Sequence, residues 1–460
     1  MKTPRWFNQT GFVSNLRIVI AIGLFAAAVG TAMVSLPSSA TGGSASAQPL
    51  VIDDSQLQAL TTTVGGGATP LATARTVTHW FGTTLNPLNG VTYGYNMVGA
   101  DPNNCSGSAC DVTITVDITP LKVNVGGLSF DGSAALPATL ASPVFATYDF
   151  GSVPFATAGS LHPRFPIGPG GPLSQGDAGN LLQLQDATMR SQFNKTGASS
   201  YHLRLVPVVH DTVTIDVPSG NGAIVETVRG VLGAGVDFQW WATRIQNLNA
   251  SLGYNDPTHL ALYLTQDTAN IYHTNPVTCC VLGFHGVHPT LNGPQNGNGN
   301  QPVQTFAWGS YVSPGFFARA FPPGGSGSWW SVQDIDPLSH EISEWADDPF
   351  INNSLQPWGT ATAQGGGCYS DLLETGDAVT GIGFAIGTNT YLQGPNPNGT
   401  NSADGHYHPE DEVHVPWFMR VAPNTISEPT QSPSTNIGRY TFMGDLNRFD
   451  GFRNPPGNCP

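Results

Sequence analysis

The segment DPLSHEISEWADDP, Asp336–Pro349, concentrates ionisable side chains in a chain that contains few of them elsewhere. Of 460 residues, 16 are Lys or Arg and 31 are Asp or Glu. Asp336 can cap a helix, Pro337 suits the first helical position, and Pro349 is a plausible stop. We therefore expect one short helix here, and any fold of this chain must accommodate its crowded charges.

This helix has two chemically different faces when successive residues are placed about 100° apart. Leu338, Ile342 and Trp345 share the apolar face. The opposite face carries His340, Glu341, Glu344, Asp347 and Asp348. Carboxylates three or four residues apart repel one another, and a helix C-terminus disfavours anions. No Lys or Arg lies within residues 320–419, so we expect a divalent cation to neutralise the cluster.

His340 and Glu344 stand four residues apart, so both can ligate one ion from the same helix face. Glu341 then lies beside the ion, where a general base for a water nucleophile belongs. The pattern follows the logic of H-E-x-x-H zinc hydrolases, with glutamate in place of the second histidine. The histidine favours Zn²⁺, although an oxygen-rich site also admits Ca²⁺ or Mn²⁺. The simpler alternative is an acidic helix face exposed to water.

A third metal ligand must come from elsewhere in the chain. Glu374, in CYSDLLETGD, is the preferred candidate, because the two leucines before it suggest a locally buried segment. Asp371 and Asp377 are alternative or supporting ligands. Isolated histidines are weaker candidates, because most of them are ordinary surface or core residues. These histidines are His285, His288, His406, His408 and His414.

The pattern of apolar residues predicts an α+β fold with a mixed sheet and a β-rich N-terminal part. Alternation predicts two strands and a turn in Thr76–Gly99, and a strand in Asp111–Val125 that is broken or ended at Pro120. Helical periodicity predicts helices in Asn180–Phe193 and Val236–Gly253. Further strands are expected in Ser142–Phe150, Tyr201–Val209, His259–Thr265, Cys279–Gly286 and Gln304–Val312.

The chain is expected to divide into four regions. Residues 1–47 resemble a long secretory signal, with basic residues before the apolar run Ile18–Leu36 and an A-x-A site at Ala45–Ala47. An uncleaved membrane anchor is the alternative, because the run is long enough to span a bilayer. Residues 48–178 form the β-rich part. Residues 179–425 form the part with the metal site, and these two parts are expected to share one fold. Residues 426–460 form an irregular tail.

Six cysteines suit an oxidising compartment and a secreted protein. Cys105 and Cys110, in CSGSAC, can close a small local disulfide loop. The sequence leaves the pairing of the other four open. Zinc binding by these cysteines is the weaker interpretation, because no C-x-x-C pair is present.

The net charge of −15 makes nucleic acid and anionic membrane surfaces poor partners. We therefore expect no nucleic-acid partner and no membrane contact beyond the N-terminal segment. A peptide or a cell-wall polymer remains as a possible substrate.

The segments LSHEISEWADDP and LLETGD together resemble the HELAEA-x-T-(D/N)-P … E-x-G-D signature of the phosphate-induced/EXORDIUM-like secreted proteins and their uncharacterised bacterial relatives. The resemblance covers Cys279 to Arg420. It implies an extracellular or wall-associated protein without an established catalytic activity. The chain departs from the plant pattern at Trp345 and in a long insertion before Glu374. The resemblance places His340, Glu341, Glu344, Asp348 and Glu374 at motif positions, and it adds Asp348 to the candidate ligands.

Two functions follow from the predicted metal site. The first is a secreted zincin-like metallohydrolase, a peptidase, with Zn²⁺ on His340, Glu344 and Glu374 and with Glu341 as general base. His408 or His285 would then stabilise the oxyanion. The second is a non-catalytic extracellular or cell-wall-associated protein in which the ion is structural. Ca²⁺ bound by acidic loops is a third possibility, whereas no G-x-S-x-G motif supports a serine hydrolase.

Overall fold

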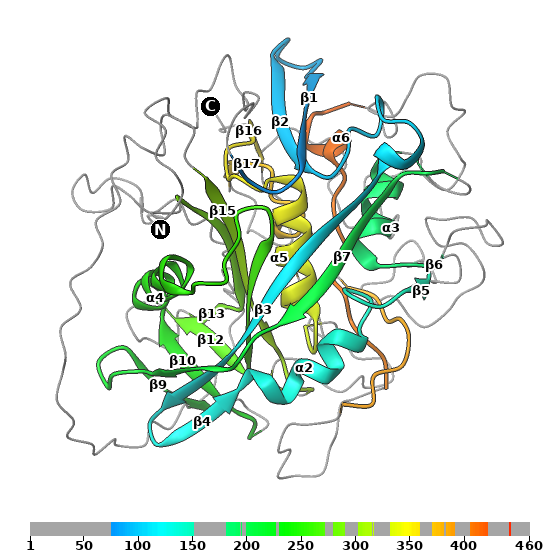
Figure 1. Ribbon diagram of the computed structural model, residues 1–460. Helices are drawn as coiled ribbons and strands as arrows, with labels where there is room; N and C mark the ends of the chain where they lie inside the picture. The colour runs from blue at the N-terminus through cyan, green and yellow to red at the C-terminus, as the bar shows by residue number, and fades with distance from the viewer. Residues whose placement is uncertain are drawn as a thin grey trace, which may run out of the picture.

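The structure is a computed structural model of the whole chain, and Figure 1 shows the arrangement of its elements. The described residues are 75–150, 181–193, 195, 199–226, 230–271, 279–289, 302–314, 316, 332–358, 370–380, 383–391, 405–421 and 441–442. The expected signal, residues 1–47, and most of the expected tail, residues 426–460, lie outside them. Within the described residues no helix is both long and apolar enough to cross a membrane.

The main sheet is mixed, and together with the helices described below it confirms the predicted α+β class. Among the described residues its strand order is β14–β15–β11–β3–β4, and β7 and β8 also pair with β3. β14 and β4 run antiparallel to their neighbours, whereas the other pairs are parallel. The bounds are β3 Asp111–Val125, β4 Leu128–Asp131, β7 His202–Val209, β8 Val213–Asp216, β11 Leu260–Gln266, β14 Gly283–Pro289 and β15 Val303–Tyr311.

Pro120 does not break β3, contrary to the sequence-based prediction. On one side of β3, β7 pairs with residues up to Ile118, and β8 takes over from Leu121. On the other side Pro120 is opposite Leu264, at the end of the paired register with β11. Proline lacks a backbone N–H, and it stands here between two partner strands, where that donor is least needed.

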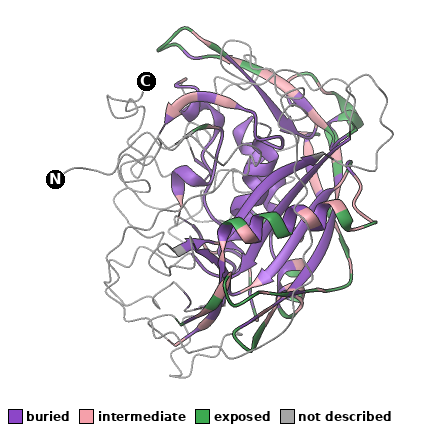
Figure 2. Ribbon diagram, turned by 90° about the vertical axis from the view of Figure 1, so that its left-hand side faces the viewer, coloured by how far each residue is buried: buried purple, intermediate pink, exposed green. Residues whose placement is uncertain are grey.

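The main sheet separates two cores. Along β11, Leu260, Leu262 and Leu264 contribute to a core that also contains residues of three helices on that side, whereas Ala261 and Tyr263 point to a core shared with a fourth helix. This alternation is the period of two expected of a strand buried on both faces. The first three helices are α2 Gly132–Ala141, α3 Leu184–Gln192 and α5 Asp336–Asp347, and the fourth is α4 Phe238–Ser251. Figure 2 shows the centre of the molecule as buried.

The smaller elements surround this framework. The predicted first two strands form an antiparallel hairpin, β1 with β2, and a second sheet has the order β13–β12–β10–β9. Two short strand pairs, β5–β6 and β16–β17, complete the described sheets. The bounds are β1 His79–Leu85, β2 Thr92–Val98, η1 Gly107–Cys110, β5 Tyr148–Asp149, β6 Leu181–Leu182, β9 Gly222–Glu226, β10 Leu232–Asp237, β12 Thr268–Ile271, β13 Cys279–Val281, β16 Ser354–Trp358, β17 Ser370–Leu372, η4 Asp377–Val379 and α6 Val415–Phe418.

The helices predicted in Asn180–Phe193 and Val236–Gly253 are confirmed as α3 and α4, each a few residues shorter than its segment. Asp237 caps α4 by accepting a hydrogen bond from the Trp240 N–H at 3.0 Å. The strand expected in Ser142–Phe150 is reduced to the two residues of β5. No periodic pattern in the sequence indicates α2, since this helix contains Pro137 and alanines without an amphipathic pattern.

The predicted local disulfide is present between Cys105 and Cys110. Cys280, in β13, is also disulfide-bonded. Cys368 and Cys459 lie outside the described residues. Two bonded positions in separate parts of the fold are consistent with the use of cysteine in an oxidising environment.

Asp267, in the turn between β11 and β12, provides a test of this packing. Its carboxylate accepts hydrogen bonds from the Ser313 N–H at 2.7 Å and the Ser313 hydroxyl at 2.5 Å, and burial raises its pKa to about 7. Between about pH 4 and pH 7 the unfolded chain has released a proton that the folded protein retains, so this group lowers stability as pH rises. Asn keeps the acceptor and tolerates the φ of +46° found here.

We expect Asp267→Asn to gain stability relative to the wild type as pH rises through this window, by on the order of 1–4 kcal/mol. Urea unfolding at a series of pH values measures the difference. Asp111→Asn is the control, because Arg204 holds the pKa of the largely exposed Asp111 carboxyl below its usual range. The difference between that variant and the wild type should stay constant through this window, because Asp111 is ionised in both the folded and the unfolded state above about pH 4. A stability difference for Asp267→Asn that is independent of pH would contradict the raised pKa of Asp267.

Candidate metal centre

Helix α5 forms as predicted, and its apolar face packs on the main sheet beside β14 and β15. Gly309 of β15 allows close approach, since a Cβ there would lie 3.1 Å from the Cα of Leu338. The Trp345 indole N–H donates to the Thr305 hydroxyl at 2.9 Å. The helix begins one residue earlier than predicted, with Ile335 at the N-cap and Asp336 as its first residue.

The acidic face of α5 is buried as well, which excludes a helix face exposed to water. His340 is 5% exposed, and Glu341 and Glu344 are 1% and 0% exposed. Burying carboxylates is costly unless they are paired, protonated or bound to a cation. The structure therefore requires positive charge or protons at this face.

His340 is oriented between two carboxylates. Its Nδ1 is hydrogen-bonded to Glu410 Oε2, and its Nε2 lies 3.1 Å from Glu344 Oε1. A carboxylate that holds one ring nitrogen of a histidine fixes the direction of the other, as in many metal sites. The backbone N–H of Glu410 donates to the Ser339 hydroxyl at 3.0 Å, which ties this segment to α5. His340 Nε2 is therefore directed toward Glu344.

The segment after β17 brings two further carboxylates to α5. Glu344 Oε1 accepts hydrogen bonds from the backbone N–H groups of Gly376 at 3.2 Å and Asp377 at 3.1 Å. The Thr375 hydroxyl lies 3.0 Å from the Ser343 hydroxyl. These contacts hold the segment against the helix, and both Glu374 and Asp377 are fully buried. Glu374 lies beside Glu344 as predicted, because a carboxylate oxygen of each lies within 4.8 Å of the other.

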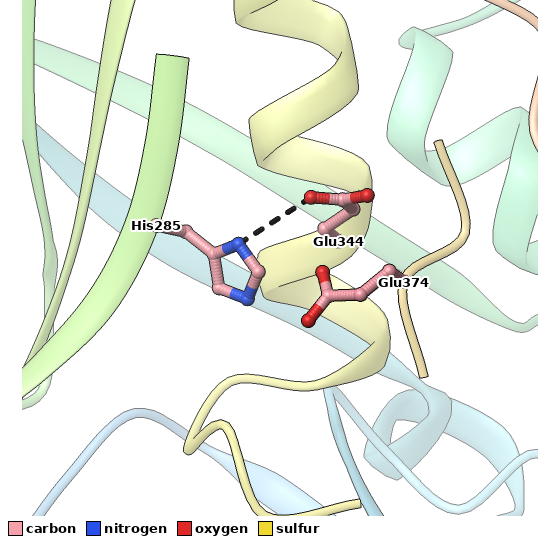
Figure 3. Close-up of side chains that lie close together, drawn as sticks. All are labelled: His285, Glu344 and Glu374. Atoms are coloured by element: carbon pink, nitrogen blue, oxygen red, sulfur yellow. Dashed lines mark ion pairs between the residues drawn. The ribbon is translucent and has the colours of Figure 1, made fainter. Parts of the chain in front are cut away.

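His285 reaches the same place from β14 (Figure 3). Its Nδ1 lies 3.5 Å from Glu341 Oε2 and 3.6 Å from Glu344 Oε2. Gly283, two residues earlier on the same strand face, makes room for Glu341, because a Cβ there would lie 2.6 Å from Glu341 Oε1. The imidazole is fully buried.

Two sets of side chains among the described residues can each hold a metal ion. One set is His340, Glu344 and Asp377, and the other is His285, Glu344 and Glu374. Within each set the ligand atoms lie within 4.8 Å of one another. The predicted ligands on residues 340, 344 and 374 are thus neighbours, but they divide between two sets that share Glu344.

The electrostatics of the cluster show how strongly it favours positive charge. Burial raises the pKa of Glu341 and of Glu374 well above their usual range. Burial also opposes the charged form of His340, but the neighbouring Glu344 and Glu410 outweigh it and raise the His340 pKa. Burial lowers the pKa of His285 to about 4, so its ring is neutral at neutral pH, whereas His340 must lose its proton before it can ligate.

A small pocket of about 40 Å³ gives access to the cluster. Such a volume exceeds what a single water molecule needs. His340, Glu341 and Asp377 line it, and so do Asp336 and Glu410, whereas His285 and Glu374 do not. One of the two sets therefore faces a pocket that also contains the predicted general base.

Two predicted site residues lie outside both sets and outside the pocket lining. Asp348 follows α5, and its carboxylate accepts from the backbone N–H of Asn352 at 3.0 Å and of Asn353 at 3.2 Å. It is the C-cap residue of α5, orders the turn after the helix and belongs to neither set. His408 Nδ1 lies 2.7 Å from Asp334 Oδ2, and His408 does not line the pocket.

Sequence reasoning missed Glu410 and gave too little weight to Asp377 and His285. Glu410 stands in HYHPEDEVH, where the histidines drew attention and the glutamate that holds His340 did not. Asp377, the last residue of LLETGD, was predicted only as an alternative or supporting ligand beside the preferred Glu374. His285 was one of several isolated histidines, and only the pairing of β14 with β15 places it over α5.

No protein-family model, curated protein or solved structure matches the chain. The donor atoms themselves therefore indicate which ions fit. Each set combines one imidazole nitrogen with carboxylate oxygens, which suits Zn²⁺ or Mn²⁺ better than Ca²⁺, an ion that prefers oxygen ligands only.

The close approach of Gly376 to His340 can be tested by adding one methyl group. A Cβ at residue 376 would lie 2.5 Å from His340 Nδ1, so Gly376→Ala must displace the imidazole or the segment. We expect the free energy of unfolding to fall by roughly 1–3 kcal/mol and metal affinity to fall with it. Chemical unfolding and metal titration measure the two effects.

Gly253→Ala is the matched control, because a Cβ there meets nothing within 4 Å. It should change stability by no more than about 0.5 kcal/mol. Equal stability and equal metal affinity of the two variants would show that Gly376 does not pack against His340.

Proposed function

We propose that the protein is a secreted metal-dependent hydrolase, with Zn²⁺ as the ion and peptides as the substrate class. One observation carries the proposal: His340, Asp377 and Glu341 line the same small pocket, and Glu344 joins the first two as a third ligand. A metal site beside a buried carboxylate is the arrangement that hydrolysis with an activated water requires.

His340, Glu344 and Asp377 would hold the ion at the pocket. Glu410 keeps His340 oriented, and the N–H groups of Gly376 and Asp377 fix one oxygen of Glu344. A bound Zn²⁺ supplies the positive charge that lowers the pKa of a water molecule and polarises a carbonyl. It also offsets the repulsion among carboxylates that no described Lys or Arg side chain in the pocket relieves.

Glu341 would be the general base, since a cation bound beside it opposes the rise in its pKa that burial causes and favours the ionised carboxylate. It accepts a proton from the attacking water at one carboxylate oxygen and passes it to the leaving amine. Gly283 lets the carboxylate lie against β14, since any Cβ there would collide with it. His408 has no role in this proposal, because it pairs with Asp334 away from the pocket lining.

Secretion is part of the same proposal. The basic residues and apolar run in residues 1–47 support it, as does the use of cysteine in disulfides at Cys105, Cys110 and Cys280. Zn²⁺ and a peptide substrate rest on the nitrogen and oxygen donors and on the resemblance of H-E-x-x-E to the zinc hydrolase pattern.

Glu341→Gln tests the catalytic role. The amide cannot accept the proton, so we expect peptide hydrolysis to fall by about 10²–10⁴-fold while metal content stays the same. Cleavage of a peptide library and elemental analysis measure the two quantities. Glu412→Gln, at another buried carboxyl that does not line the pocket, is the control and should retain activity. Unchanged turnover in Glu341→Gln would refute the assignment.

The depth of the site favours a second candidate function. His285, Glu344 and Glu374 are completely buried, which suits a structural ion that joins β14, α5 and the segment after β17. In this alternative the protein is a non-catalytic extracellular or cell-wall-associated binder. It would hold the ion without cleaving any peptide.

His340→Ala separates the two functions when activity and stability are measured together. Removing the imidazole leaves Glu344 and Glu410 without their partner, so we expect a loss of about 3–5 kcal/mol in unfolding free energy. A catalytic site loses hydrolysis as well, whereas a structural site has none to lose. His202→Ala, at a partly exposed histidine paired with Asp186, is the control for loss of a histidine–carboxylate contact.

A further inference from the structure

Glu344 presents its two carboxylate oxygens to two different histidines. Oε1 lies 3.1 Å from His340 Nε2, and Oε2 lies 3.6 Å from His285 Nδ1. The two histidines come from different elements, α5 and β14, and approach the carboxylate separately. A carboxylate placed in this way can bridge two metal ions, each with its own nitrogen ligand.

The set around His285 is buried, and His285 Nδ1 also faces Glu341 Oε2 at 3.5 Å. Neither carboxylate oxygen of Glu374 and neither ring nitrogen of His285 has a hydrogen-bond partner, and both side chains are 0% exposed. Figure 3 shows His285, Glu344 and Glu374 turned toward one another from β14, α5 and the segment after β17. Buried polar groups are almost always satisfied, so these atoms indicate a missing ligand.

The charges favour more than one cation. The carboxylates of the two sets and of the pocket lining are Asp336, Glu341, Glu344, Glu374, Asp377 and Glu410. Within the two sets and the described pocket lining, the side chains that can carry positive charge are those of the two histidines, and none is Lys or Arg. One divalent ion balances two of these carboxylates, and a second balances two more.

We infer that the protein holds a two-ion centre with Glu344 as the shared ligand. An outer ion binds His340, Glu344 and Asp377 at the pocket, and an inner ion binds His285, Glu344 and Glu374 behind it. The inference deepens the proposed function and rests on its metal site. It assigns a second ion to His285 and Glu374, which the proposed hydrolytic mechanism does not use, together with the shared Glu344.

The two sites have different surroundings. His340 and Asp377 line the pocket, whereas His285 and Glu374 do not. The outer site therefore borders the pocket, and the inner site does not. The inner ion would link β14 to α5 and fix the orientation of Glu344. A mild chelator should remove the outer ion first.

Metal stoichiometry after loading with Zn²⁺ and dialysis is the first test. We expect two equivalents in the wild type and about one in His285→Ala, Glu374→Gln and His340→Ala. His288→Ala is the matched control, because residues 285 and 288 point to opposite faces of β14. It should retain two equivalents.

A second measurement needs no variant. Mn²⁺ suits the same donors, and two Mn²⁺ ions bridged by Glu344 should give an exchange-coupled electron paramagnetic resonance spectrum in the wild type. One equivalent of metal together with the six-line spectrum of an isolated ion overturns the two-ion inference. If His340→Ala also removes that one ion, the proposed function survives. Absence of any bound metal overturns both.

Discussion

The burial of Glu341, Glu344 and Glu374 beside one another is the constraint on which the rest of the structure depends. Carboxylates in a protein interior cannot all remain ionised without nearby positive charge. In the described residues the opposing groups at this place are His285 and His340. The cluster is therefore stable only with protons or cations, and its arrangement around two histidines suits cations.

The surrounding fold is organised to keep these groups together. Ser339 and Ser343 stand four residues apart on α5 and hold the two segments that deliver Glu410 and Glu374. Glycines on β14, β15 and the segment after β17 allow the chain to approach the helix closely. The mixed sheet supplies the rigid support, because β14 and β15 lie directly against α5. Rigid elements hold catalytic groups more precisely than loops do.

Local patterns in the sequence predicted what depends on near neighbours in the chain. The α+β class, α5, and the pairing of His340 with Glu344 follow from periodicity and from the i, i+4 spacing. His285 and Glu410 could not be found in this way, because strand pairing and a distant loop bring them to the site. Asp348 is the C-cap residue, so a helical projection does not give the direction of its side chain, and it lies in neither set. Pro120 was misread because its effect depends on which strand pairs at that point.

The most direct test of the central claim is a crystal structure of the mature protein with anomalous diffraction recorded above and below the zinc absorption edge. A cation that neutralises the cluster predicts an anomalous peak between His340 Nε2, Glu344 and Asp377. The opposite result is a crystal grown in the presence of Zn²⁺ that shows no anomalous peak at this position. Its carboxyl groups would then be joined to one another by short hydrogen bonds through shared protons. That result would show that protons alone stabilise the cluster.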